Sequence, residues 1–294
     1  MKIRQKKIRA ASFAPRAAGP VARPAAPRRG PTAVGVAALI SGSFALVQVP
    51  VHAAGLPTPC PTGGTVCKGL TFDRLNTGST LNYGPNQLTI KQNAGSAIFN
   101  WQSFNITAGN TVQFVQPSNS SVALNRIFDP NLTTIAGTLK ANGQVYLINP
   151  NGILFGSGAQ VDVGGLIAST LNVSDQRVTK GLLYDTTVTN PVFTNNPAYV
   201  GTDLAASPGA NPAIVVQPGA TLYAAGRDQA GTVVSAGRVF LFAPQVENGG
   251  TIKVDGGGQA ILASGSDVYL GSSSDPELRG LLVCLLYTSP SPRD

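Results

Sequence analysis

The chain has 294 residues, with 21 Lys and Arg against 13 Asp and Glu, and its formal net charge is +8. Residues 1–53 hold nine of the basic side chains and no acidic one, whereas residues 54–283 hold 11 basic and 12 acidic side chains. The body of the chain is therefore nearly neutral and lacks the basic patch that phosphate contacts require. We expect no nucleic-acid partner.

Composition narrows the fold class of the body. Glycine makes up 34 of the 294 residues and charged residues only 12%, against usual fractions of about 7% and about 25%. Long helix-forming runs of Ala, Leu, Glu and Lys are missing, which excludes a coiled coil or a helix bundle and favours short strands joined by turns. A hydrophobic fraction of 43% also excludes a disordered chain.

Residues 1–53 are typical of an export signal with a long basic front. A stretch rich in Pro, Ala and Arg precedes an interrupted apolar segment, and Val51-His52-Ala53 fits the small-residue rule for cleavage. We expect cleavage between Ala53 and Ala54, which also removes the only histidine of the chain. The alternative is a membrane anchor, but the apolar segment is shorter than the about 20 residues that a spanning helix needs.

Residues 284–294 resemble the translation of a transposon-type sequencing adapter, and the natural chain is expected to continue beyond Val283.

Without residues 284–294, two cysteines remain, Cys60 and Cys67, and in an exported protein such a pair favours a local disulfide. A metal site is not favoured, because no third cysteine and no histidine remain to complete a coordination shell. We expect no cofactor.

The body contains internal repeats. Residues 142–150 (NGQVYLINP) match residues 236–244 (AGRVFLFAP), and short β-rich segments bounded by Gly, Asn or Pro recur about every 20 residues. This pattern predicts an all-β fold, a right-handed parallel β-helix whose stacked coils share one core. Residues 54–283 would form roughly eleven coils in a stack about 50 Å long. A β-sandwich is the main alternative, but it does not predict near-identical strand-and-turn units in sequential register.

Side-chain alternation and turn chemistry refine this prediction. Within the predicted strand at residues 144–148, Val145 and Leu147 should point to one face. The segment Asn149-Pro150-Asn151-Gly152 should form a tight turn, because Pro fixes φ, Asn accepts local backbone hydrogen bonds and Gly allows a positive φ. Trp101, the only tryptophan, is expected in the core.

Five segments carry a resemblance to a known family, and they lie at residues 98–106, 112–117, 123–127, 143–156 and 163–170. They resemble the secretion domain of two-partner-secretion exoproteins, also called the filamentous haemagglutinin N-terminal domain, and the high-molecular-weight adhesin branch is the most similar. The Asn-Pro-Asn-Gly-Ile sequence is a specific signal in this context. The long basic leader is also common in the family, whereas the cysteine pair departs from its pattern.

The resemblance implies a β-helix with an N-terminal cap and recognition by a dedicated partner. That partner is an outer-membrane β-barrel transporter with periplasmic recognition domains. The residues assigned to the secretion motif and to recognition are Asn100, Asn105, Asn125, Arg126, Asn149, Pro150, Asn151 and Gly152. For Asn151 and Gly152 the simpler interpretation is that they only shape a corner of the β-helix. Asn125 and Asn149 would either contact the partner or form buried amide hydrogen bonds along the coils.

We therefore expect residues 54–175 to be the secretion domain and residues 176–283 to continue the β-helix of a large surface adhesin from a Gram-negative bacterium. Such a chain would fold coil by coil outside the cell, since each coil contacts only its neighbours. A host-cell receptor or glycan would be bound by downstream regions. The alternatives are a cytolysin or contact-dependent toxin, direct host-cell adhesion by the module itself, and a polysaccharide-active enzyme. An enzyme is not favoured, because the aspartates are scattered and no histidine is left as a general base.

Overall fold

The computed structural model describes residues 55–184, 190–200, 204–207, 212–228, 230–272, 274 and 281–286. The leader and its expected cleavage site at Ala53 and Ala54 lie outside these residues. In the part of the chain that is described, no helix combines the length and the apolar character needed to cross a membrane.

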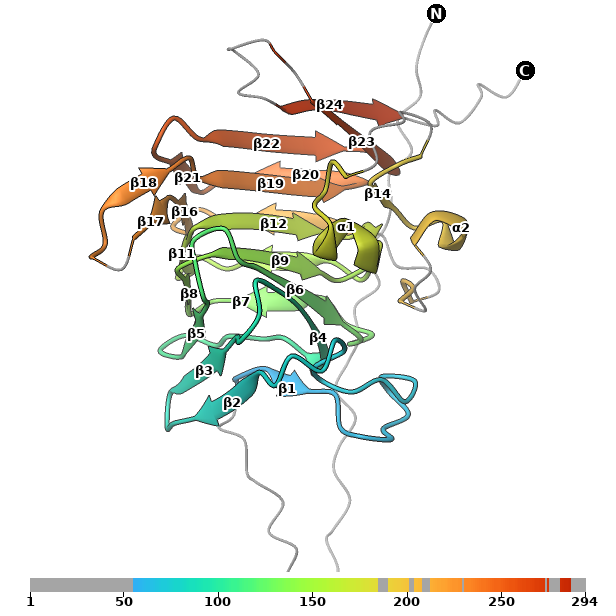
Figure 1. Cartoon of the computed structure of the whole chain (residues 1–294), viewed down its shortest axis with the longest axis vertical. Coiled ribbons are helices and arrows are strands. Elements are labelled where there is room, and N and C mark those ends of the chain that lie inside the picture. The colour runs from blue at the N-terminus through green and yellow to red at the C-terminus, as the bar shows by residue number, and fades with distance from the viewer. Residues whose placement is uncertain are drawn as a thin grey trace, which may run out of the picture. The chain divides into compact units, whose positions relative to one another are not determined.

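Three sheets of mostly parallel strands form the sides of a stack of coils (Figure 1). The first sheet contains, in spatial order, β1 (Thr58–Pro59), β4 (Ser96–Ser103), β6 (Val122–Ile127), β9 (Gln144–Ile148), β12 (Gly165–Ser169), β19 (Arg238–Ala243) and β22 (Gln259–Ser264). The second contains β2 (Thr80–Tyr83), β3 (Gln87–Lys91), β5 (Thr111–Val115), β8 (Thr138–Ala141), β11 (Gln160–Val163), β16 (Thr221–Ala224) and β21 (Thr251–Val254). The third contains β7 (Thr133–Ile135), β10 (Ile153–Phe155), β15 (Ala213–Val216) and β20 (Gln245–Asn248).

Consecutive coils are stacked in register. In the second sheet, Leu139 of β8 lies beside Val161 of β11, which in turn lies beside Leu222 of β16. The two matching repeats form β9 and β19, which both belong to the first sheet. At the N-terminal end β1 and β2 pair antiparallel with β4 and β3 and form the cap. The prediction of a parallel β-helix with an N-terminal cap is confirmed.

The number of coils is smaller than predicted. The described residues contain six parallel strands in the second sheet, namely β3, β5, β8, β11, β16 and β21. The estimate of roughly eleven coils assumed about 20 residues in each coil. It is wrong because the chain leaves the stack between β12 and β15, and again in the hairpin of β17 (Gly226–Arg227) and β18 (Val233–Ser235).

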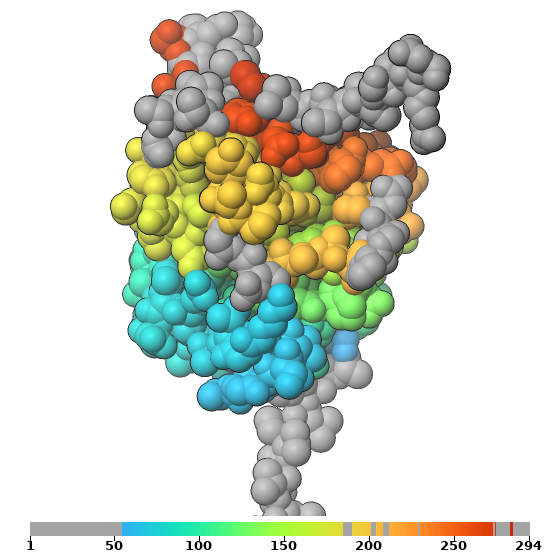
Figure 2. Space-filling view, turned by 90° about the vertical axis from the view of Figure 1, so that its right-hand side faces the viewer, coloured from blue at the N-terminus to red at the C-terminus, as the bar shows by residue number. Residues whose placement is uncertain are grey.

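Residues 170–212 are called the extra-helical segment, and described residues of this range, among them Val173, Val178 and Phe193, pack against the outer face of the first sheet. Their described part contains β13 (Asn172–Val173), α1 (Asp175–Thr179), β14 (Phe193–Thr194) and α2 (Pro197–Val200). In Figure 2 this segment, in yellow, covers the stack between the cap in blue and the last coils in red. An antiparallel outer sheet joins β13 and β14 to β23 (Asp267–Ser272) and β24 (Leu281–Leu286). β24 includes the first residues of the segment interpreted as an adapter translation, and that interpretation remains a prediction.

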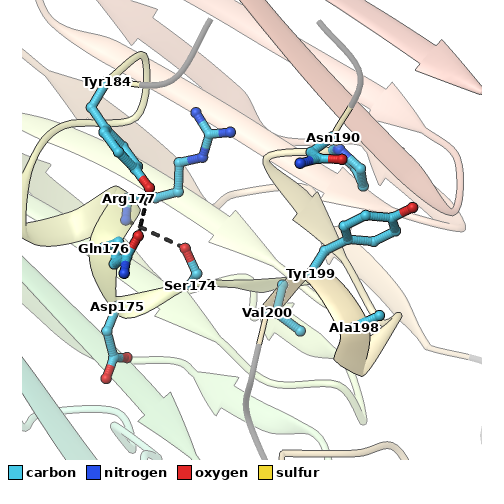
Figure 3. A pocket seen from close by; sticks show the side chains of 10 residues that line it. Ser174, Asp175, Gln176, Arg177, Tyr184, Asn190, Ala198, Tyr199 and Val200 are labelled. Carbon is cyan, nitrogen blue, oxygen red and sulfur yellow. Dashed lines mark hydrogen bonds between the residues drawn. The ribbon is translucent and has the colours of Figure 1, made fainter. Parts of the chain in front are cut away.

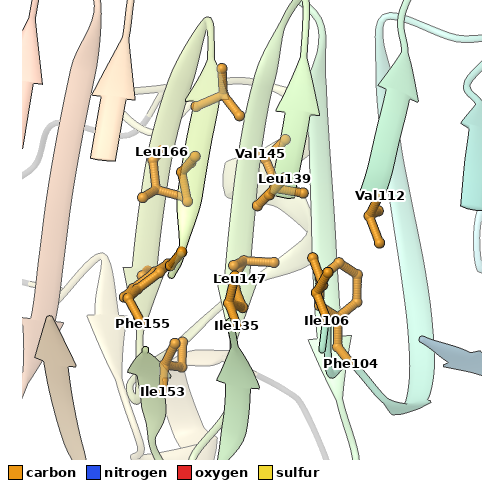
Figure 4. Packing of buried hydrophobic residues seen from close by; sticks show 14 of the residues in the cluster. Phe104, Ile106, Val112, Ile135, Leu139, Val145, Leu147, Ile153, Phe155 and Leu166 are labelled. Atoms are coloured by element: carbon orange, nitrogen blue, oxygen red, sulfur yellow. The ribbon is translucent and has the colours of Figure 1, made fainter. Parts of the chain in front are cut away.

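The first sheet is buried on both faces. Val145 and Leu147 point into the interior of the coils, as predicted, where they pack with neighbours such as Leu139 and Leu166 (Figure 4). The alternate residues of the same strand, including Tyr146, belong to a second apolar cluster beneath the extra-helical segment. We call these clusters the inner core and the outer core.

The cap closes the N-terminal end of the inner core. Trp101 is fully buried, as predicted, and meets the rings of Phe104 and Phe72 edge-on at centroid distances of 5.2 and 5.0 Å. A disulfide joins Cys60 and Cys67, whose Cα atoms are 5.8 Å apart, and so closes the loop that leads into the cap. The aromatic residues of the cap thus cover what would otherwise be an exposed end of the core.

Candidate functional site

The structure distributes the eight predicted motif residues over three places rather than one surface patch. Asn125 points into the inner core, and Asn100 and Arg126 lie side by side on the outer face of the first sheet. The others lie at the corner between the first and third sheets. The residues therefore share a region of the β-helix but no common exposed surface.

Asn125 links three coils through a buried amide. Its side chain is 0% exposed, and its Oδ1 accepts a hydrogen bond from Trp101 Nε1 at 2.8 Å. Its Nδ2 donates to the carbonyl oxygens of Ala123 at 3.1 Å and Tyr146 at 3.2 Å. Since an unpaired buried amide is costly, this network explains why asparagine stands in an apolar interior. Of the two roles predicted for Asn125, the folded structure contains the buried hydrogen bonds.

Asn149 organises the corner that follows β9. The amide of Gly152 donates to the carbonyl oxygen of Asn149 at 3.1 Å, and the amide of Asn151 donates to Asn149 Oδ1 at 2.9 Å. The Asn149 Nδ2 donates to Thr133 Oγ1 at 3.0 Å and to the carbonyl oxygen of Asn131 at 3.1 Å. The tight turn is confirmed, and the Asn149 side chain, 0% exposed, holds it against the preceding coil.

Pro150, Asn151 and Gly152 complete this corner. Pro150 is buried, and Gly152 has a φ of +115°, a conformation that residues with a Cβ rarely adopt. A Cβ at Gly152 would also lie 3.1 Å from the carbonyl oxygen of Ala213. Asn151 Oδ1 accepts from the amide of Ser207 at 2.6 Å and so ties the corner to the extra-helical segment. For Asn151 and Gly152 these contacts support the simpler interpretation of a shaped corner.

Asn100 and Asn105 also serve internal contacts. Asn100 is fully buried, and its Nδ2 donates to the carbonyl oxygen of Thr71 at 2.8 Å, which fastens the cap to β4. Asn105 Oδ1 accepts from the amide of Thr134 at 2.7 Å, between the end of β4 and β7. Asn105 follows the end of β4, and its side chain replaces a backbone hydrogen bond where the chain leaves regular strand geometry.

Arg126 forms an ion cluster that the sequence did not reveal. Its side chain is only 3% exposed, its Nη1 donates to the Asp175 carboxylate, and its Nη2 donates to the carbonyl oxygen of Val173 at 2.6 Å. Arg74 Nε donates to the same carboxylate at 2.6 Å. Asp175 and Arg74 were missed because they lie 49 residues after and 52 residues before Arg126, with no local pattern connecting them.

The ion cluster shifts the titration of its members. Partial burial raises the pKa of Asp175, but the charges and hydrogen bonds of Arg126 and Arg74 outweigh burial and hold that pKa below its ordinary value of 3.8. Burial lowers the pKa of the Arg126 guanidinium, and Asp175 partly opposes this effect. The carboxylate form of Asp175 is therefore favoured by the folded state.

This lowered pKa predicts how the stability contribution of Asp175 depends on pH. A group whose pKa is lower in the folded state stabilises fully above its unfolded pKa and loses that contribution as pH falls through the folded pKa. The difference in Tm between the wild type and Asp175→Asn is therefore expected to be largest at neutral pH and to shrink as pH falls below 3.8. Thermal unfolding measured over pH would show this, and a difference that stays constant in strong acid would contradict it.

A cleft of about 400 Å³ opens between α1 and α2 (Figure 3). Tyr184 and Tyr199 stand on opposite sides of it, and the Tyr184 hydroxyl donates to Gln176 Oε1 at 2.6 Å. Among the described residues that line it, Asp175 is the only carboxylate, and it is already paired with two arginines. The described lining does not include the paired carboxylates of a glycosidase. Nor do the described residues contain a group of three or more His, Cys, Asp or Glu that could hold a metal ion.

The fold and the motif define a capped parallel β-helix module with an asparagine–proline corner. Residues 70–277 match the family model described as the TPS secretion domain, which is more than half of the chain. The chain belongs to this family, the secretion domains of two-partner-secreted exoproteins. The matched range includes most of the segment expected to be the secretion domain, residues 54–175, and most of the segment expected to continue the β-helix, residues 176–283.

Individual relatives agree with this assignment. The chain is 45% identical over 84 residues, 29% of its length, to a heme/hemopexin-binding protein from Haemophilus influenzae. It is also 45% identical over 85 residues to the heme/hemopexin-binding protein of Haemophilus influenzae strain ATCC 51907 / DSM 11121 / KW20 / Rd. Its fold is similar to the crystal structure of the HMW1 secretion domain from Haemophilus influenzae, with a TM-score of 0.51 and 25% identity over 72% of this chain. The match covers 47% of that solved chain and 9% of the two curated relatives.

Proposed function

We propose that this chain is the N-terminal secretion module of a large surface adhesin of a Gram-negative bacterium. An outer-membrane β-barrel transporter with periplasmic recognition domains binds the module, and the module folds as a β-helix outside the cell. The family match supports this role, because exoproteins with this domain cross the outer membrane through such a partner. The similarity to the HMW1 secretion domain supports the adhesin branch.

The burial of two motif asparagines supports recognition of the unfolded chain by the transporter. Asn125 and Asn149 are both 0% exposed, and their amide groups are hydrogen-bonded inside the β-helix. A transporter can reach these side chains only while the segment is unfolded. Recognition therefore precedes folding, and folding withdraws the motif from the transporter. This order makes export directional, since the folded module cannot be bound again through the same residues.

The proposal gives the module no catalytic role. Host-receptor or glycan binding, and equally any cytolysin or toxin activity, would reside in regions of a longer protein that this chain does not include. Direct adhesion by the module itself is separable by experiment, because the purified module either binds host cells or does not. Polysaccharide cleavage would require a carboxylate pair facing a substrate groove.

Asn149→Ala tests recognition when the exoprotein and its transporter are expressed together. We expect about a tenfold loss of secreted protein, the size expected when one or two hydrogen bonds to the partner are lost. The matched control is Thr133→Val, which removes the hydroxyl that accepts from Asn149 Nδ2 in the folded structure but leaves the motif intact. Secretion should stay normal in this control.

Two outcomes would contradict the proposal. Unchanged secretion of Asn149→Ala would remove this residue from recognition. An equal loss in both variants would show that Asn149 acts through the stability of the folded corner. The amount of transporter-bound precursor in the periplasm, measured by crosslinking, gives a second reading that does not depend on folding outside the cell.

A further inference from the structure

Three segments that are distant in sequence meet at the ion cluster on the outer face of the first sheet. Arg74 belongs to the cap, Arg126 to β6, and Asp175 is the first residue of α1. The Arg126 side chain is 3% exposed, whereas Arg74 and Asp175 are 34% and 31% exposed. The buried charge of Arg126 is therefore the part of the cluster that most needs a partner.

Every hydrogen-bond partner observed for the Arg126 side chain lies in one later stretch of the chain. The Asp175 carboxylate and the Val173 carbonyl oxygen accept from its two terminal nitrogens, 49 and 47 residues further on. Its Nε and the Oδ1 of Asn100, the residue paired with it on β4, are buried and lack a partner among the described residues. In the folded structure, the described residues of the earlier coils thus provide no acceptor to this guanidinium, and its acceptors come from residues 173 and 175.

The outer core depends on the same stretch. Ile98 and Leu124, on β4 and β6, are fully buried on the outer face of the first sheet. The residues that join them in this cluster from the extra-helical segment include Val173, Val178 and Phe193. Until that segment docks, the first coils keep an apolar face in water, which lowers their stability. The Arg126 guanidinium is buried only when the same segment covers it and supplies its carboxylate.

We propose that Arg126 and Asp175 form a folding lock, so that the module folds as one unit from the cap to the extra-helical segment rather than coil by coil. The link to export rests on the proposed function, in which the module folds outside the cell, and on the further premise that residues 55–127 cross the membrane before Asp175. The first coils then remain unlocked until Asp175, 49 residues after Arg126, has crossed the membrane. The coils that precede the extra-helical segment therefore do not fold stably while the chain crosses the membrane. A large part of the folding free energy of the module is released when the extra-helical segment docks.

Refolding of the leaderless chain, residues 54–294, tests the lock without a transporter. Pulse-labelling by hydrogen exchange reports when each backbone amide becomes protected. We expect the amides of β4 and β6 to become protected in the same kinetic phase as those of β13 and α1. Protection of β4 and β6 in an earlier phase would overturn the lock and leave the proposed function intact. A defect in secretion would test the proposed function, whereas the order in which these amides become protected tests only the lock.

Asp175→Asn removes the charge of the lock, and Asp162→Asn is its matched control. Asp162 also accepts a hydrogen bond from an arginine, Arg227, at 2.6 Å, but the two side chains are 47% and 28% exposed. We expect Asp175→Asn to lower Tm by about 10 °C, because it leaves a buried guanidinium without its counter-charge. The control should lower Tm by less than about 3 °C, as for other exposed pairs. Equal effects of the two variants would overturn the lock.

Arg126→Met keeps the proposal testable even where Asp175→Asn fails to fold. A methionine at this position needs no carboxylate and can be buried against Ile148, its neighbour in the register on β9. In this variant we expect β4 and β6 to become protected before α1, since the wait for Asp175 is removed. An unchanged order of protection would overturn the role of Arg126 in the lock.

Discussion

Asn125→Leu is expected to lower the free energy of unfolding by about 3 kcal/mol, although leucine has a similar volume and the surroundings are apolar. The substitution leaves Trp101 Nε1 without the acceptor that it has at 2.8 Å, in a fully buried position. It also removes the donors to the carbonyl oxygens of Ala123 and Tyr146. Urea unfolding of the leaderless chain measures this loss.

Asn131→Leu is the matched control for that measurement. Asn131 is exposed, and its side chain donates to Asp129 Oδ1 at 3.0 Å within the same loop. Its replacement should change the free energy of unfolding by no more than about 0.5 kcal/mol. A loss below about 1 kcal/mol for Asn125→Leu would mean that the indole and the carbonyl groups find other partners, and the network would not be a stabilising element.

Local chemistry explains which parts of the fold the sequence predicts. Alternation within residues 144–148 placed Val145 and Leu147 in the inner core, because the period of two is a property of every strand. The turn at residues 149–152 followed from the φ preferences of Pro and Gly. The coil repeat followed from turn residues at regular intervals. Each of these features depends on residues that are close together in the sequence.

The outer core and the ion cluster depend instead on contacts between distant segments. Tyr146 and Ile148 are apolar on the face that a simple β-helix would expose, and β12 (Gly165–Ser169) is buried throughout. Such two-sided apolar strands signal a covering layer, but they do not say which segment supplies it. The extra-helical segment has no repeat of its own, so neither its position nor the pairing of Arg126 with Asp175 could be predicted.

The predicted motif residues also differ from expectation, because contacts between distant segments bury several of them. Asparagine and arginine side chains are usually exposed, and a motif of such residues therefore indicates a contact surface. In the structure Asn100, Asn125, Arg126 and Asn149 are buried and make internal hydrogen bonds. A role in recognition and a role in folding can coexist only if they act at different times. The buried position of the motif thus ties the proposed recognition to the unfolded chain.

Gly137→Ala should separate recognition from folding, with an effect as large as that of Asn125→Leu. A Cβ at Gly137 would lie 2.4 Å from the carbonyl oxygens of both Thr107 and Asn110, which are backbone atoms of the preceding coil. We expect the free energy of unfolding to fall by about 3 kcal/mol, because a tightly packed corner cannot move away. Gly95→Ala is the control, since a Cβ there has no atom within 4 Å and the φ of Gly95 is not positive.

Because recognition is proposed to act on the unfolded chain, Gly137→Ala should leave transporter-dependent release unchanged. The released protein should nevertheless be digested by added protease under conditions in which the wild type and Gly95→Ala survive, since proteolysis follows the population of unfolded chains. Asn149→Ala should instead reduce transporter-dependent release, so that less protein is found outside the cell. If Gly137→Ala reduced release as strongly as Asn149→Ala does, the transporter would have to recognise a folded corner, and recognition before folding would be wrong.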